Sequence, residues 1–236
     1  MMNNKGKYIG LNQRIPFEVL DLAIQNYLDS DVVDKSKILQ HMLIFTSGVN
    51  RANKASNYVV QILSRQESLL KKIKKSLKQS TFESLSNADR KALSLSLISL
   101  TYPITYDLLV ALAQGFKVQT QINKKFINEK VMAIYGSNRT VDIAIDALLP
   151  MLIELSTIKR DKVSIYSLAN RLAITNKFIQ ELIIYTDIKL SSTKSILVDD
   201  LGYRPWFTYF DLPQTNNYQY LVSKKDSAVG RGYLTL

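Results

Sequence analysis

Four polar residues between positions 175 and 180 have side chains that can recognise a base pair or a phosphate. They are Thr175, Asn176, Lys177 and Gln180. The amides of Asn176 and Gln180 can pair with an adenine edge, and the ammonium of Lys177 can reach a guanine or a phosphate. Such recognition needs a helix that presents these side chains outward near its start. The spacing therefore predicts a DNA-reading helix that begins near Asn176.

The stretch Ile165 to Ile184 has the spacing of two short helices that meet at a sharp turn. Leu168 and Leu172 lie four residues apart, and Ile179 and Leu182 lie three apart, so each helix has one inward face. This pattern is typical of a helix-turn-helix, whose second helix enters the major groove of DNA. We therefore expect the second helix to carry the recognition residues.

Details of this stretch fit the motif in part. Ala169 lies where the two helices would approach most closely, and Thr175 or Asn176 would cap the second helix. Ala173 occupies the turn position that usually holds glycine, where a left-handed backbone costs about 1 kcal/mol. Glu181 adds an acid that a phosphate would repel. An ordinary helical hairpin inside a helical core fits the same pattern.

The charge balance points to an acidic partner. The 236 residues include 31 Lys and Arg against 20 Asp and Glu, which leaves a formal net charge of +11. A nucleic acid is the first partner that such a surface suggests. An AT-biased genome, whose proteins are rich in lysine, would produce the same surface without a function. The apolar share of 46% and the charged share of 22% are ordinary for a soluble globular protein.

Three basic groups accompany the predicted motif. The first precedes it, the second falls in an expected wing over 189–198, and the third lies on a helix expected over 69–80. Their members are Lys159, Arg160 and Lys162, then Lys189 and Lys194, then Lys71, Lys72 and Lys75. Lysines on the third helix are equally explained as a solvated face. If the three groups share one face of the structure, DNA binding is favoured.

Residues that would support catalysis are sparse. The sequence has no glycine-rich phosphate-binding motif, and its one histidine, His41, has no serine or cysteine motif beside it. Asp199 and Asp200 are adjacent, so in a strand they would point to opposite faces and not share one metal. With no cysteine present, disulfides and thiolate metal sites are excluded. We therefore expect a non-enzymatic protein without a metal or cofactor.

Caps and chain breakers mark a series of helices, so the predicted fold class is mainly α. We expect helices from Pro16 to Leu28, from Asp34 to Phe45, from Arg51 to Leu63, from Ser86 to Pro103, from Tyr106 to Phe116, from Ile122 to Gly136 and from Arg139 to Ile158. After Asp187, β-branched and aromatic runs predict two or three short strands. The aromatic group of Tyr203, Trp206, Phe207, Tyr209 and Phe210 is expected to pack on the helices rather than to stack on bases.

These elements suggest a multi-helix bundle followed by a C-terminal helix-turn-helix or winged helix. We expect a helical domain over 1–136, a helix-turn-helix domain over 137–212, and a tail over 213–236 that is extended or partly mobile. The basic N-terminus has no apolar run behind it, so a secretory signal is not expected. The most apolar window, 143–155, is too short and too charged to cross a bilayer. A cytoplasmic protein without membrane contact is the expectation.

Three longer segments give the chain a family resemblance. They read LSNADRKALSLSLISLTYPITYDLL, FINEKVMAIYG and RTVDIAIDALLPMLIELSTIKRDK. In helix order and apolar texture, about residues 50 to 190 resemble the BrxA family of BREX phage-defence systems. The resemblance implies a small, non-enzymatic, helical protein of winged-helix character that binds double-stranded DNA. It also implies a role beside the methyltransferase and the other components that mark host DNA and block phage.

Two hypotheses about function follow. The first is a DNA-binding accessory protein of an antiviral defence system, with duplex DNA and other defence proteins as partners. The second is a protein-interaction scaffold, whose helical bundle and aromatic C-terminal segment dock other subunits while the basic surface is incidental.

Overall fold

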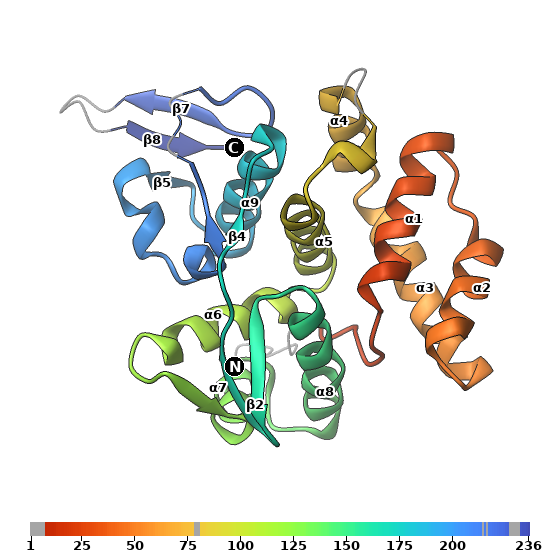
Figure 1. Ribbon diagram of the computed structural model, residues 1–236. Helices are drawn as coiled ribbons and strands as arrows, with labels where there is room; N and C mark the ends of the chain where they lie inside the picture. Colours follow the sequence, from red (N-terminus) through yellow and green to blue (C-terminus); the bar gives the residue numbers. More distant parts are fainter. Residues whose placement is uncertain (1–7, 78–80, 214, 216, 227–231) are drawn as a thin grey trace, which may run out of the picture.

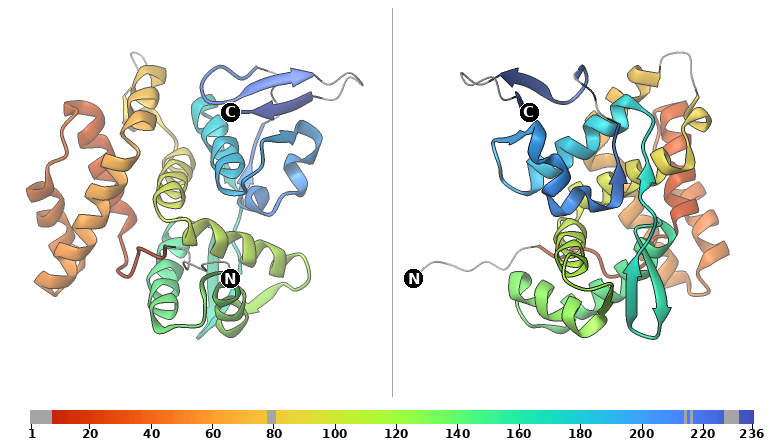
Figure 2. Two further views of the ribbon diagram at one scale, coloured as in Figure 1. Left: turned by 180° about the vertical axis from the view of Figure 1, so that it is seen from behind. Right: turned by 60° about the vertical axis from the view of Figure 1, so that its left-hand side comes forward.

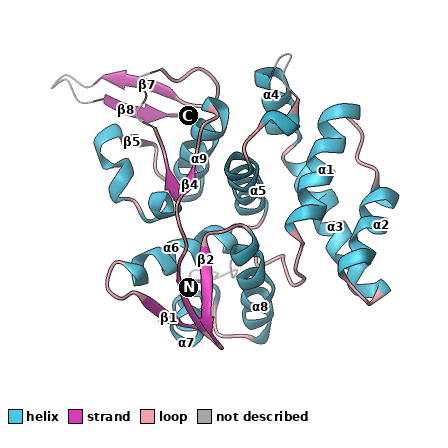
Figure 3. Cartoon of the chain, in the orientation of Figure 1, coloured by secondary structure: helices cyan, strands magenta, loops and turns pink. Residues whose placement is uncertain are grey.

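The computed structural model describes residues 8–77, 81–213, 215, 217–226 and 232–236. The protein is mainly helical, with short strands in small sheets (Figure 1, Figure 3). The longer helices are α1 (Phe17–Ser30), α2 (Lys35–Phe45), α3 (Val49–Arg65), α4 (Glu67–Leu77), α5 (Asn87–Thr101), α6 (Ile104–Phe116), α7 (Lys124–Tyr135), α8 (Arg139–Glu154) and α9 (Lys177–Leu190). The short 3-10 helices are η1 (Phe82–Ser84), η2 (Val198–Tyr203) and η3 (Pro205–Tyr209).

The strands form three small sheets. They are β1 (Gln121–Asn123), β2 (Ile158–Lys162), β3 (Ile165–Leu168), β4 (Leu172–Ala173), β5 (Ser195–Leu197), β6 (Phe210–Asp211), β7 (Ser223–Asp226) and β8 (Gly232–Thr235). The first sheet has the order β1-β3-β2, the second pairs β4 with β6 in parallel, and the third has the order β5-β8-β7.

The N-terminal helices lie close to the predicted ranges, and α2 and α5 begin at the predicted caps. Asp34 caps α2 by accepting a hydrogen bond from the Lys37 amide at 3.0 Å. Ser86 caps α5 in the same way, because its hydroxyl accepts from the Asp89 amide at 3.0 Å. Gly48 is the N-cap of α3, and α2 ends before it at Phe45. The mainly helical fold class is confirmed.

Helix α5 is the centre of the molecule. It lies between the N-terminal helices and α9, and α6 continues from it after Pro103 at an angle of 115° (Figure 1). Nearly all of its residues from 92 to 99 are fully buried. Within the described part of the chain, no single helix is long and apolar enough to span a membrane, and α5 and α6 would pass that test only together, as a bent pair.

Residues 104–168 form one compact unit in the order α6, β1, α7, α8, β2, β3. A turn of Gly136, Ser137 and Asn138 joins α7 to α8, and Gly136 takes a left-handed backbone with φ +87°. The hairpin β2–β3 returns to β1, so β1, before the helix pair, and β2–β3, after it, share a sheet. The predicted domain boundary at 136 would divide this sheet.

The C-terminal region is built on α9, which packs on α5. Four members of the aromatic group are buried, as expected for packing, whereas Tyr203 is exposed. Trp206 donates its indole N–H to the Ile183 carbonyl at 3.0 Å, and the Tyr209 hydroxyl donates to the Leu109 carbonyl at 2.7 Å. These bonds tie the aromatic segment to α9 and α6.

The helix-turn-helix predicted at 165–184 is wrong in its first helix. Residues 165–168 form strand β3, and Ala169 donates its amide to the Thr157 carbonyl at 3.2 Å instead of lying at a helix crossing. Over so few positions, the apolar spacing of a strand and that of a short helix can coincide. The spacing therefore does not distinguish the two structures here. The wing expected over 189–198 is not confirmed, since α9 continues through Leu190 and the next strand, β5, pairs with β8 of the tail. The winged helix predicted for 137–212 is therefore not confirmed.

The tail is more ordered than expected where it is described. Strands β7 and β8 pair with each other, and β8 also pairs with β5 (Figure 2). Part of that prediction falls on residues 214, 216 and 227–231, and the end of the predicted 69–80 helix falls on 78–80. These lie outside the described residues.

Candidate nucleic-acid interface

The start of α9 is occupied by a carboxylate of the protein itself. The Asp89 carboxylate of α5 accepts from the Thr175 amide at 3.0 Å, the Thr175 hydroxyl at 2.6 Å and the Asn176 amide at 3.1 Å. Asn176 caps α9 as predicted, with its side chain bound to the amides of Phe178 and Ile179. An anion thus already sits where a helix would receive a phosphate.

Further along α9, the predicted recognition face is buried. Gln180 is 5% exposed and donates its amide to the Pro213 carbonyl. Glu181 is 2% exposed, and its carboxylate accepts the backbone amides of residues 219 to 222 at 2.6 to 3.2 Å. Of the four predicted readers, only Lys177 is both exposed and without such an internal bond in the described residues. Base edges therefore have no access to Gln180.

The other end of α9 is fixed by a buried ion pair. Asp187 is 1% exposed and pairs with Arg204, and its carboxylate also accepts from the Tyr106 hydroxyl at 2.6 Å. Burial and the Asp187 charge raise the pKa of Tyr106, so the phenol stays protonated and keeps donating. Beyond this end, Lys189 and Lys194 are exposed. Helix α9 is therefore anchored at both ends as a core helix.

The pair α7–α8 has the free helix start that α9 lacks. Asn138 caps α8 through the amides of Thr140 and Val141, at 2.9 and 3.2 Å. Arg139 and Thr140 are exposed beside it, and Ile143 is 40% exposed one turn later. A three-residue turn that contains glycine is typical of helix-turn-helix motifs. Sequence reasoning missed these residues, although Gly136 and the Asn138 cap are visible in the sequence.

The basic residues of the β2–β3 hairpin lie on two different faces of its sheet. Lys159 stands opposite Ser167 and Lys162 opposite Ile165, while Arg160 stands opposite Tyr166. Directly opposed residues share a face, and residues two apart on one strand share a face. The bulge between Arg160 and Lys162 adds one residue, so Lys159 and Lys162 lie on the same face. Arg160 lies on the other face, with buried Tyr166.

The turn of the hairpin also lies beside the start of α7. The Lys124 amide donates to the Ser164 carbonyl at the hairpin turn, at 2.8 Å, so the first turn of α7 lies beside the hairpin. Lys125 follows and is exposed. We call Lys125, Lys159 and Lys162 the hairpin cations.

Three acids of this unit, Asp161, Asp146 and Asp142, are engaged in internal contacts. Asp161 accepts from the Gln121 amide at 2.8 Å and from the Ser167 hydroxyl at 2.9 Å. On α8, Asp146 forms an ion pair with Lys124, and Asp142 accepts from Asn128 at 2.8 Å. The hairpin cations have no ion pair with a carboxylate in the described part of the chain. An external anion can therefore reach them, but the Asp161 carboxylate keeps its negative charge and bonds to Ser167 on the face of Lys159.

The lysines of α4 are separate from this surface. Lys71 pairs with Glu67 at 2.6 Å, and the hydrogen bond from Lys71 lowers the pKa of Glu67. Lys72 and Lys75 are exposed. Helix α4 and the β2–β3 hairpin lie at opposite ends of the molecule in every view (Figure 1, Figure 2). The α4 group and the hairpin group therefore do not lie together, so the single basic face that would favour DNA binding is not found.

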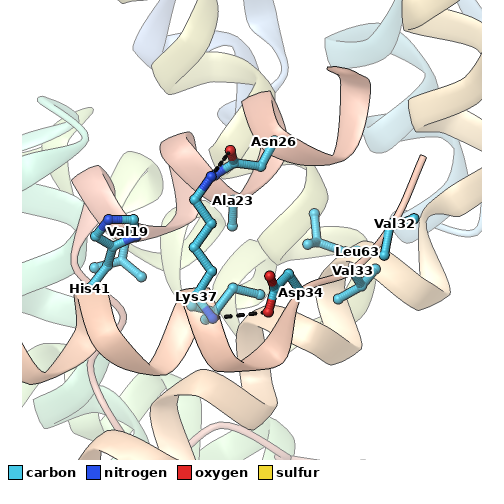
Figure 4. Close-up of a pocket in the computed structure, with 10 residues that line it drawn as sticks. Val19, Ala23, Asn26, Val32, Val33, Asp34, Lys37, His41 and Leu63 are labelled. Atoms are coloured by element: carbon cyan, nitrogen blue, oxygen red, sulfur yellow. Dashed lines mark hydrogen bonds between the residues drawn. The ribbon is translucent and has the colours of Figure 1, made fainter. Parts of the chain in front are cut away.

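His41 lines a small hollow between α1 and α2 (Figure 4). Beside it, Lys37 donates its ammonium to the Asn26 side chain at 2.7 Å, and Asp34 caps α2. The residues that line the hollow include no hydroxyl or thiol for His41 to activate. Among the described residues, no group of three or more His, Asp or Glu is placed to hold a metal ion.

Comparison with known proteins found no similar family, protein or structure. No family model matches the chain, and neither a curated protein nor a solved structure matches it. The geometry of the unit 104–168 therefore carries the functional argument.

Proposed function

We propose that residues 104–168 act as a winged helix that binds duplex DNA. In this arrangement α7 and α8 are the helix-turn-helix, α8 enters the major groove, and the β2–β3 hairpin is the wing. The observation that carries the proposal is the β1-β3-β2 sheet, because it sets a basic hairpin beside a helix pair joined by a glycine turn. The DNA-binding unit thus lies earlier in the chain than the sequence spacing predicts.

The exposed face of α8 supports only limited base recognition. Arg139 offers a guanidinium to a guanine edge, and Thr140 and Ile143 offer methyl groups to thymine. No exposed amide follows them on this face, and Asp146 is held by Lys124. We therefore expect weak sequence preference, with most of the affinity from phosphate contacts.

The hairpin cations are the proposed phosphate contacts. Each neutralised phosphate releases counterions, so log K falls by about 0.9 for each tenfold increase in salt. Three contacts correspond to a slope of about −2.7, or roughly a 40-fold loss of affinity between about 50 and about 200 mM salt. Arg160 lies on the other sheet face and contributes less.

Fluorescence anisotropy with a labelled random-sequence duplex tests this proposal. The full chain should bind, with the salt dependence given above, and Arg139→Ala should weaken binding to all duplexes or change the preferred sequence. A matched Gln180→Asn variant reports on α9 and should leave DNA affinity unchanged, because Gln180 is buried. Binding that is absent at about 50 mM salt, or flat across the salt range, would contradict the proposal.

A role in a BREX-type defence system stays a prediction that rests on the sequence resemblance. Recording phage infection with and without the protein in its own host would test that role directly. The scaffold hypothesis receives no support from the aromatic C-terminal segment, because most of that segment is buried. A different surface supports a protein partner, as argued next.

A further inference from the structure

The corner between α2 and α3 exposes a cluster of large apolar side chains. Ile44 is 74% exposed, Val49 63%, Phe45 47% and Leu43 44%. They occupy the last turn of α2 and the first residue of α3, within seven positions of the chain. We call these four residues the corner patch. Single exposed apolar residues are ordinary, but a cluster of this kind marks an interaction site.

Folding does not explain the corner patch. Helix α2 already buries its inward residues, Ile38 and Met42, against the core. The four residues of the corner patch are not part of this buried stripe. In Figure 1 the corner is at the outer edge of the molecule, away from α9 and the sheets. No described segment of the chain covers it.

Along the chain, the charges nearest the corner patch have one sign. Residues 35–65 include no Asp or Glu, and their five basic residues are Lys35, Lys37, Arg51, Lys54 and Arg65. The nearest carboxylates along the chain are Asp34, about 16 Å from the corner along α2, and Glu67, about 27 Å away along α3. Arg51 is closest, with its side-chain carbons beside Gly48. An occupant with carboxylates around an apolar centre is complementary to this surface.

We propose that the corner patch docks an acidic segment of a partner protein. Apolar side chains of that segment cover Ile44, Phe45 and Val49, and its carboxylates face Arg51 and Lys54. Such an interface has an apolar centre and a charged rim, as protein interfaces commonly do. The proposal is independent of DNA binding, because the hairpin cations lie on other elements.

Two other occupants fit less well. A second copy in a symmetric contact would bring the same cations against each other, and like charges at an interface repel. A membrane-surface helix carries an apolar face along many turns. Here the exposed apolar residues occupy one helical turn and a corner, so an anionic membrane is the weaker match.

Amphipathic peptide probes test the proposal with the full-length protein. One labelled helix of about 18 residues, or five turns, carries leucine on one face and glutamate on the other. Its counterpart carries lysine in place of glutamate, and phosphatidylserine vesicles are the membrane probe. We expect the glutamate peptide to bind at least about tenfold more tightly than the lysine peptide.

Three variants locate the binding. The double variant Ile44→Ser/Phe45→Ser should weaken glutamate-peptide binding by about tenfold or more, and Arg51→Glu should weaken it too. Val118→Ser is the matched control, because Val118 is 87% exposed elsewhere on the surface; it should change nothing. Circular dichroism confirms that each variant is folded.

Two results would overturn the proposal. One is equal affinity for both peptides, or affinity that the Ile44→Ser/Phe45→Ser variant leaves unchanged. The other is vesicle binding that this variant abolishes while no peptide binds, which would assign the corner patch to a membrane. None of these measurements uses DNA. A negative result for the corner patch can therefore be distinguished from a negative result for DNA binding.

Discussion

Helices α8 and α9 begin with the same side-chain cap and then differ in every respect that matters for recognition. Asn138 and Asn176 each bind two amides of the helix that follows. At α9 the preceding residues are held by Asp89, and the helix behind them is buried. At α8 the first residues are exposed. A cap therefore identifies a helix start, while the surroundings decide whether that start is free to bind.

The ion pairs of the two helices should differ most in their contribution to stability. Asp187→Ala leaves Arg204 without its partner in a largely buried site, so we expect a loss of about 3–5 kcal/mol in the free energy of unfolding. Asp146→Ala on α8 removes an ion pair whose aspartate is 60% exposed, and should cost less than about 1 kcal/mol. Urea denaturation of both variants measures the difference. Equal losses would mean that α9 is no more deeply anchored than α8.

Glu181 gives a second way to challenge the core role of α9. Glu181→Gln replaces a carboxylate that accepts four backbone amides with a group that has one acceptor oxygen. We expect a loss of about 2–3 kcal/mol. Hydrogen exchange should speed up at the amides of residues 219–222. Unchanged exchange there would show that this contact does not hold the tail on α9.

The contacts that hold α9 in the core come from residues distant in the sequence. The sequence therefore predicts the helices well, but it does not predict that the expected DNA-reading helix is buried. The limits of α2, α5 and α7 follow from local groups, namely Asp34, Ser86 and Gly136. The burial of α9 depends on Asp89, which lies 86 residues before Thr175. The spacing of residues within α9 cannot reveal a contact with a residue so distant in the sequence.

The hairpin was missed for a related reason. Strand β1 has three residues and pairs with β3 more than 40 positions later, at Gln121 and Ser167. The turn of the hairpin contains Ser164 at φ +61° rather than a glycine or asparagine, so the usual turn residue is absent. The basic residues at 159–162 were recognised, but their division between two faces depends on a bulge.

The turn between α7 and α8 should show a smaller but measurable effect. Gly136→Ala has room for its Cβ, since the nearest atom lies at 4.0 Å, but its φ of +87° is strained for alanine. We expect a loss of about 1–2 kcal/mol and weaker DNA binding, because the two helices would shift. Thermal unfolding and anisotropy on the same sample measure both. A stable variant with normal DNA affinity would argue against the helix-turn-helix assignment.

We propose that the hairpin, rather than the lysine-rich helix α4 or the start of α9, contacts DNA. The most direct test is the salt dependence of duplex affinity for Lys159→Ala/Lys162→Ala beside the matched pair Lys72→Ala/Lys75→Ala. Both variants remove two exposed cations from a net charge of +11. We expect the hairpin variant to lower the magnitude of the slope of log K against log salt by about 1.8, and the α4 variant to leave it unchanged. Equal slopes for the two variants, or a change in the α4 variant alone, would contradict it.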